Sequence, residues 1–169
     1  MIHYRVIAAL FIVLACLSPS VLYAGQPSDM EINNVLSVSE SLFQAMKEKQ
    51  YPKVWTKITE KTKDKTIDST YRELKKSGSP TPRETIEDDF RQGGAISKAY
   101  WDGYLSFFDP RLVLEHSKWT IGMIGRDKAE INIHFKKSPH PAVLQLFREN
   151  EIWKVGLHET FGGRSLLLF

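Results

Sequence analysis

Acid–base chemistry needs side chains that exchange protons near neutral pH, and histidine is the first residue type to examine. His116 follows an alternating stretch of leucines, so on a strand it would share their inward face and reach the rim of a cavity. The best catalytic constellation in the sequence combines His116 with Glu159, assisted by Tyr100 or Tyr104. Each of these residues also has a structural explanation: a hydrogen-bonded histidine, a solvated strand end and two core aromatics.

Other signatures of catalysis or cofactor binding are missing from the sequence. It contains no Gly-rich phosphate loop, no nucleophile elbow and no cluster of His or carboxylate residues at metal-ligand spacing. The charge is nearly balanced, with 23 basic and 20 acidic residues and a net charge of +3, whereas nucleic-acid binders carry a strong basic excess. We therefore expect no cofactor, no metal and no nucleic-acid partner.

Residues 1–24 have the layout of a secretory signal peptide. Arg5 precedes a short apolar run, and Ala24 supplies the small residue expected before a cleavage site. The run is too short to cross a bilayer, which requires roughly 20 apolar residues. We therefore expect residues 25–169 to form a single exported domain, periplasmic or secreted.

The only cysteine, Cys16, keeps a second form of export open. The four residues ending at Cys16 are similar to a bacterial lipobox, in which the cysteine becomes a lipidated N-terminus. Leu14 is bulkier than that pattern prefers, and the following residues stay apolar where lipoproteins have a polar tether. We favour cleavage after Ala24 and expect membrane attachment only if Cys16 is lipidated.

The mature sequence divides into a helical half and a strand half. Ser28 and Thr81 each stand three residues before a glutamate, the arrangement of a capping box. Apolar residues then recur at helical spacing as far as residue 108, and from residue 111 the period changes to two. The expected helices cover about 28–49, 52–58, 64–76, 82–92 and 95–108, and the expected strands 112–116, 118–124, 129–136, 142–148 and 151–159.

Two hairpin registers follow from matching the apolar faces of neighbouring strands. A turn at residues 125–127 would pair Trp119 with Ile133, Ile121 with Ile131 and Met123 with Ala129. A two-residue turn at 149–150 would pair Leu146 with Trp153, Leu144 with Val155 and Ala142 with Leu157. The order of elements predicts an α+β fold, with N-terminal helices packed on a curved antiparallel sheet of four to five meander strands.

This layout, ending in the hairpin Phe147–Val155 with its Glu-Asn-Glu turn and Trp-Lys-Val strand, resembles the NTF2-like domains, which are cystatin-like α+β cones. The resemblance covers roughly residues 28–160. It implies a pocket between the sheet and the helices. The inward-facing and aromatic residues expected to line this pocket are Tyr100, Tyr104, Trp119, Met123, Ile133 and Trp153.

The opposite face of the sheet carries a different signal. Val143, Phe147 and Ile152 should lie on this outer side, where an apolar cluster would suit a subunit interface. Our first hypothesis is therefore an exported, non-catalytic binding or assembly module. It would hold a small apolar ligand in its pocket and a second copy or another protein on its sheet face. The alternative is a small pocket enzyme of isomerase or hydratase type that uses His116, Glu159 and a tyrosine.

Overall fold

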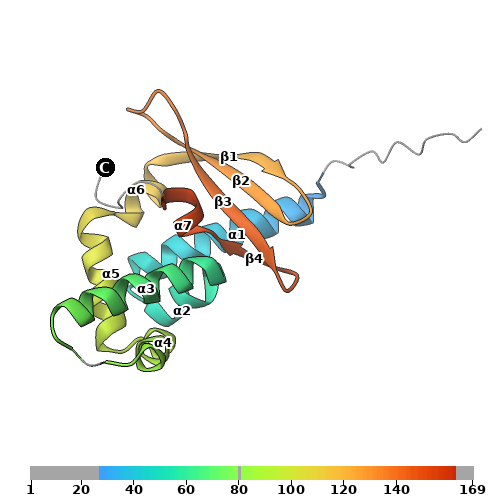
Figure 1. The fold of residues 1–169 in the computed structure, drawn as a ribbon. Helices are drawn as coiled ribbons and strands as arrows, with labels where there is room; N and C mark the ends of the chain where they lie inside the picture. The colour runs from blue at the N-terminus through green and yellow to red at the C-terminus, as the bar shows by residue number, and fades with distance from the viewer. Residues whose placement is uncertain (1–26, 80, 163–169) are drawn as a thin grey trace, which may run out of the picture.

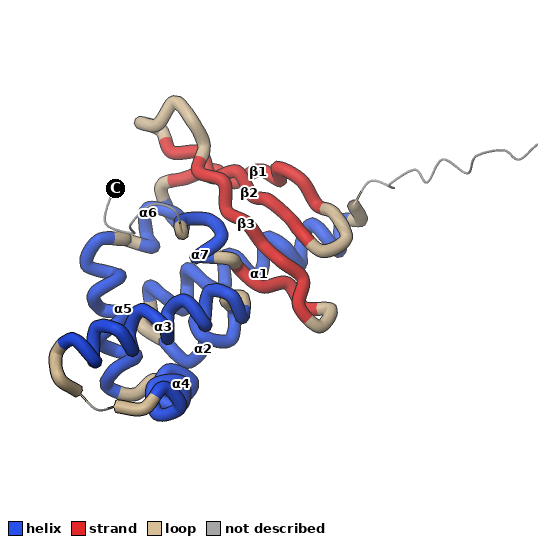
Figure 2. The backbone as a smooth tube through the Cα atoms, viewed as in Figure 1, coloured by secondary structure: helices blue, strands red, loops and turns tan. Residues whose placement is uncertain are grey.

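Helices and a meander sheet form two adjoining parts of the molecule in the computed structural model, which describes residues 27–79 and 81–162 (Figure 1). The sheet is antiparallel with the strand order β1-β2-β3-β4, so the predicted α+β class is confirmed (Figure 2). The elements are α1 (Asp29–Lys47), α2 (Tyr51–Lys57), α3 (Glu60–Lys76), α4 (Arg83–Gln92), α5 (Ala95–Phe107), α6 (Pro110–Glu115), β1 (Ser117–Ile124), β2 (Lys128–Phe135), β3 (Ala142–Glu149), β4 (Ile152–Val155) and α7 (Leu157–Phe161).

Side-chain caps fix the starts of several helices. Ser28 accepts a hydrogen bond from the backbone N–H of Glu31 at 3.2 Å, which confirms the serine half of the first expected capping box. The carboxylate of Glu31 does not complete the box, because it accepts from Arg148 and Trp153. The second expected cap is wrong, because Pro82 occupies the N-cap position of α4 and Thr81 instead hydrogen-bonds Ser79 at 2.8 Å. Helix α3 begins earlier than expected, since Thr59 caps the N–H of Thr62 at 3.1 Å.

The strand expected at residues 112–116 is the helix α6. Asp109 accepts from the backbone N–H of Arg111 at 2.9 Å, and Pro110 occupies the first turn, where its fixed φ favours a helix. Val113 then becomes the buried residue of this short helix. Consequently His116 is the C-cap residue of α6 and lies exposed. The expectation that it lies on a strand and faces inward with the leucines was wrong.

The first hairpin follows the predicted register at its open end and departs from it near the turn. Trp119 pairs with Ile133 and Ile121 with Ile131, as expected. A β-bulge at Gly122 then shifts the pairing, so Met123 pairs with Glu130 rather than with Ala129. The bulge leaves Met123 44% exposed.

The second hairpin is displaced by two residues from the predicted register. Asn150 and Glu151 form its turn with positive φ values of 49° and 63°, as a type I′ turn requires. Leu146 therefore pairs with Val155 and Arg148 with Trp153, so the expected pairing of Leu146 with Trp153 was wrong. A shift of two preserves which side chains face the core, because the side-chain period of a strand is also two.

Strand β4 ends at Val155, well before the expected residue 159, and α7 follows directly. Beyond the end of β4, residues at the start of α7 hydrogen-bond the backbone of Gln145 in β3. Gly156 donates to the carbonyl of Gln145, and the hydroxyl of Thr160 accepts from its N–H, both at 2.9 Å. One part of the core lies between α1 and the inner face of the sheet, and α1 also packs against α2, α6 and β4. The same core continues among α2, α3, α4 and α5. The inner strand residues Ala129, Ile131, Leu144 and Leu146 are all fully buried.

Glycine substitutions test the packing of α4 against α2. Gly93 has a φ of +73°, and an added Cβ would lie 2.7 Å from Pro52 Cγ, whereas Gly78 has a φ of +82° with open space around it. We expect Gly78→Ala to destabilise the fold by about 1–2 kcal/mol through backbone strain alone. Gly93→Ala should cost clearly more, because it adds a clash. Urea unfolding of both variants measures the difference, and equal losses would contradict this account.

Candidate functional site

Two of the aromatic residues predicted to line a pocket lie on α5 and pack against the same tryptophan. Tyr100 and Tyr104 both pack against Trp101, with ring centroids 5.1 and 5.6 Å away. Trp119 packs edge-on against Phe43 at 5.8 Å. The other predicted pocket residues lie apart: Ile133 is buried in the sheet core, Met123 is exposed beside the bulge, and Trp153 lies at the opposite end of the sheet.

Burial raises the pKa of both tyrosines above the ordinary value near 10, and for Tyr104 the neighbouring Tyr100 adds to the effect. The hydroxyl of Tyr100 lies 3.4 Å from that of Thr66. The hydroxyl of Tyr104 is buried and has no hydrogen-bond partner among the described residues. Both side chains are therefore held in their neutral, protonated form well above neutral pH.

The proposed catalytic residues occupy separate places. Both carboxylate oxygens of Glu159 accept hydrogen bonds at 2.9 Å, one from Thr59 and the other from Thr62, which ties α7 to the start of α3. His116 lies at the end of α6, and within residues 27–79 and 81–162 no hydrogen bond or ion pair connects it to Glu159, Tyr100 or Tyr104. The structure thus brings the two tyrosines together but places the histidine and the glutamate on different helices.

The three predicted interface residues differ in exposure. Ile152 is 57% exposed and Val143 is 39% exposed. Phe147 is partly buried and pairs with Lys154, not with Ile152 as expected, because of the register shift. Its ring also lies close to Gly156 at the start of α7.

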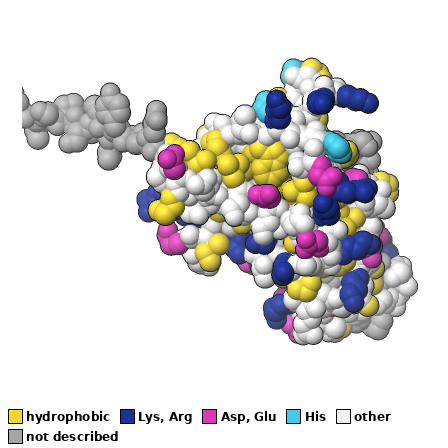
Figure 3. Space-filling model, turned by 180° about the vertical axis from the view of Figure 1, so that it is seen from behind, with side chains coloured by type: hydrophobic (Ala, Val, Ile, Leu, Met, Phe, Trp, Pro, Cys, Tyr) yellow, Lys and Arg dark blue, Asp and Glu magenta, His cyan; other side chains and the backbone are white. Residues whose placement is uncertain are grey.

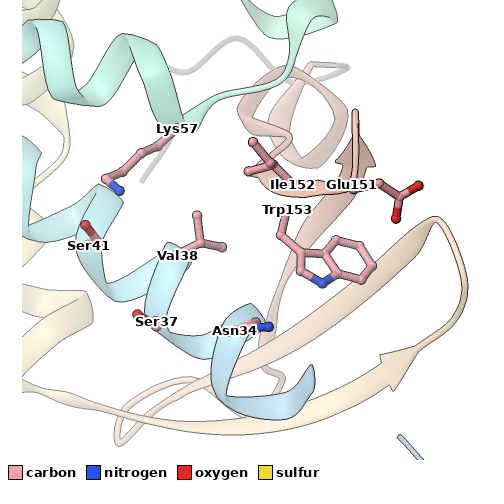
Figure 4. Close-up of a pocket in the computed structure, with 8 residues that line it drawn as sticks. All are labelled: Asn34, Ser37, Val38, Ser41, Lys57, Glu151, Ile152 and Trp153. Carbon is pink, nitrogen blue, oxygen red and sulfur yellow. The ribbon is translucent and has the colours of Figure 1, made fainter. Parts of the chain in front are cut away.

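A groove lies between α1 and strand β4, and Ile152 forms part of its wall (Figure 4). Its cavity volume is about 340 Å³. Val38 points from α1 into the space between Lys57 and Ile152. The eight lining residues are Asn34, Ser37, Val38, Ser41, Lys57, Glu151, Ile152 and Trp153.

Trp153 is fixed in place at this groove by two neighbours. Its indole N–H donates to Glu31 Oε1 at 2.8 Å, and the same oxygen accepts from the guanidinium of Arg148. The guanidinium carbon of Arg148 lies 4.5 Å from the centre of the Trp153 ring, a cation–π contact. The position of this side chain is therefore fixed by contacts within the fold.

The polar wall of the groove comes from one face of α1. Asn34, Ser37, Val38 and Ser41 follow the i, i+3, i+4, i+7 spacing of a helix face. A second hollow of about 340 Å³ shares Ser37 and Ser41 and extends the groove toward Lys53 of α2. This wall was not among the predicted sites, although the small polar residues at helical spacing were a usable signal in the sequence.

Basic and acidic side chains lie interspersed on the face shown in Figure 3, and hydrophobic side chains gather across its upper half. In the part of the chain that the structure describes, no three His, Asp or Glu side chains are placed to hold a metal ion. None of the helices within residues 27–79 and 81–162 combines the length and apolarity that crossing a bilayer requires. The predicted signal segment, residues 1–24 with Cys16, lies outside the described residues.

Comparison with known proteins found no matching family model, no similar curated protein and no similar solved structure. The resemblance to NTF2-like domains therefore stays a prediction.

Removing the charge of Glu31 tests how Trp153 is held. Glu31 and Arg148 are each only 23% exposed in their side chains. Glu31→Gln therefore leaves a partly buried guanidinium whose other described carboxylate partner, Glu151, is exposed and 3.9 Å away. We expect a loss of about 2 kcal/mol in unfolding free energy. The matched control is Glu73→Gln, whose ion pair with Lys76 is largely exposed and should matter little. Equal effects in urea unfolding would argue against the role given to Glu31.

The buried tyrosines predict a stability loss at alkaline pH. The pKa of Tyr104 is raised in the folded state, so above pH 10 the unfolded chain releases a proton that the folded chain retains. The unfolding free energy should therefore fall as the pH rises above 10. Tyr104→Phe should reduce the slope of that fall and change stability little at pH 7, because the hydroxyl has no described partner. Unchanged slopes between pH 9 and 11.5 would contradict the assignment.

Proposed function

We propose that this protein is a non-catalytic binding or assembly module that holds a partner in the groove between α1 and β4. The observation that carries the proposal is Ile152, an apolar side chain left 57% exposed beside the fixed Trp153. An apolar centre with a polar rim is the usual anatomy of a protein contact site. Here Ile152 and Val38 form the apolar part, the buried Trp153 adds little exposed surface, and the serines of α1 form the rim.

Preorganisation supports this proposal. Trp153 is only 5% exposed, and its contacts with Glu31 and Arg148 fix the strand segment that carries Ile152, so little conformational entropy is lost when a partner binds at Ile152. Of the three residues predicted to form an interface, Val143, Phe147 and Ile152, this proposal keeps only Ile152. We expect the module to act outside the cytoplasm, as residues 1–24 predict.

Site-specific photo-crosslinking in the cells that produce the protein tests the proposal. Benzoylphenylalanine at position 152 should give a discrete adduct, while the same residue at Val143, another exposed apolar position, should not. The substitution Ser41→Arg fills the groove with a long side chain and should remove the adduct. Equal adducts at both positions, no adduct at 152, or an adduct that survives Ser41→Arg would each count against the proposal.

A further inference from the structure

Strand β4 forms one edge of the sheet, and the direction of its backbone groups can be read from its pairing. In an antiparallel pair, residues alternate between hydrogen-bonded and non-hydrogen-bonded positions. Gly156 donates to the carbonyl of Gln145, so this position is hydrogen-bonded. The Arg148–Trp153 pair lies three steps along the ladder and is therefore not. Hence the backbone N–H and C=O of Trp153 point away from β3, toward the open edge.

The same edge already accepts an extended segment one step further along. The backbone groups of Val155, two residues after Trp153, also point away from β3. The carbonyl of Val155 accepts from the N–H of Thr59 at 3.1 Å. Ile58 forms an isolated parallel bridge with Val155. Trp153 is the next outward-facing position, and along residues 27–79 and 81–162 nothing outside the sheet bonds its backbone N–H or C=O.

The groove contains this open position. Val38 and Ile152 supply apolar surface on its two sides, and Lys57 lies at one end (Figure 4). Lys57 forms no ion pair within the described chain. Glu151, at the hairpin turn, marks the opposite end and lies 3.9 Å from Arg148 at the limit of an ion pair, with its side chain 92% exposed. The charges of the groove therefore favour an occupant with a carboxylate at the Lys57 end and a neutral or basic group at the Glu151 end.

We propose that the groove receives an extended peptide segment of a partner protein, which adds beside Trp153 as a further strand. The segment places an apolar residue between Val38 and Ile152 and an acidic residue at Lys57. This inference rests on the proposed function and specifies the partner. Strand addition uses main-chain hydrogen bonds for affinity and side-chain pockets for specificity. Because Trp153 alone offers two main-chain bonds here, the side-chain contacts must supply much of the selectivity.

Selection from a library of random seven-residue peptides displayed on phage tests this inference, followed by synthesis of the enriched sequences. We expect enriched peptides with an apolar residue near the centre and an acidic residue at one end. Ile152→Asp and Lys57→Glu should each weaken binding about tenfold or more, while Val143→Asp serves as the matched control on an exposed apolar residue outside the groove. Methylation of single peptide nitrogens should abolish binding at one position, because it removes a main-chain donor. The amide of Trp153 should exchange its hydrogen at least about tenfold more slowly in the complex.

The outcomes separate the two proposals. Peptides that need Ile152 and Lys57 but tolerate every backbone methylation, without protection of the Trp153 amide, overturn strand addition and leave the groove as a binding site. A library without enrichment, or peptides that ignore the groove substitutions, overturns the peptide inference. If in addition crosslinking at position 152 gives no adduct, the proposed function fails as well.

Discussion

The carboxylate of Glu31 is the contact on which the relation between helix and sheet depends. It lies in the first turn of α1, where a negative charge is favourable, and its backbone N–H is bonded by Ser28. From that position it accepts from both Arg148 and Trp153, which are paired across β3 and β4. One residue thus fixes the N-terminal end of α1 against the last hairpin. The groove exists between these two elements, so its shape depends on the same contact.

The fold class and the first hairpin could be predicted because they depend on local signals. Alternating apolar residues place Trp119 opposite Ile133, and a helix period marks α1. The failures occur where a single local geometry overrides the pattern. Asp109 and Pro110 start a helix in a segment whose leucines alternate, and the positive φ values of Asn150 and Glu151 move the last hairpin by two residues. The prediction of which strand residues are buried stayed correct in the second case, because a shift of two residues does not change the face on which a side chain lies.

The candidate site was harder to predict because its residues come from distant parts of the chain. Asp102 shows the same difficulty outside the site: Lys98 stands four residues earlier on α5, at helical spacing, yet the structure pairs Asp102 with Lys49 at 2.8 Å and with the hydroxyl of Tyr51. Lys49 and then Tyr51 lower the pKa of the Asp102 carboxyl through these bonds. Likewise, Ser41 and Lys57 share a groove with Ile152 only because α1, α2 and β4 meet. Sequence spacing defines the face of α1 but not what that face meets.

The early end of β4 explains why the sheet edge is open at one position. A Cβ on Gly156 would lie 2.9 Å from the ring of Phe147, so glycine permits the chain to turn there into α7. Thr160 then satisfies the N–H of Gln145, and Thr59 occupies the carbonyl of Val155. These contacts close the edge on one side of Trp153, and the hairpin turn ends it on the other. An exposed strand edge is a liability for any soluble domain, and proteins usually cover or shorten it. Here the covering stops one outward-facing position short, at Trp153. The groove at this position has an apolar wall and Lys57, which has no ion pair among the described residues, and this coincidence supports the proposed binding role.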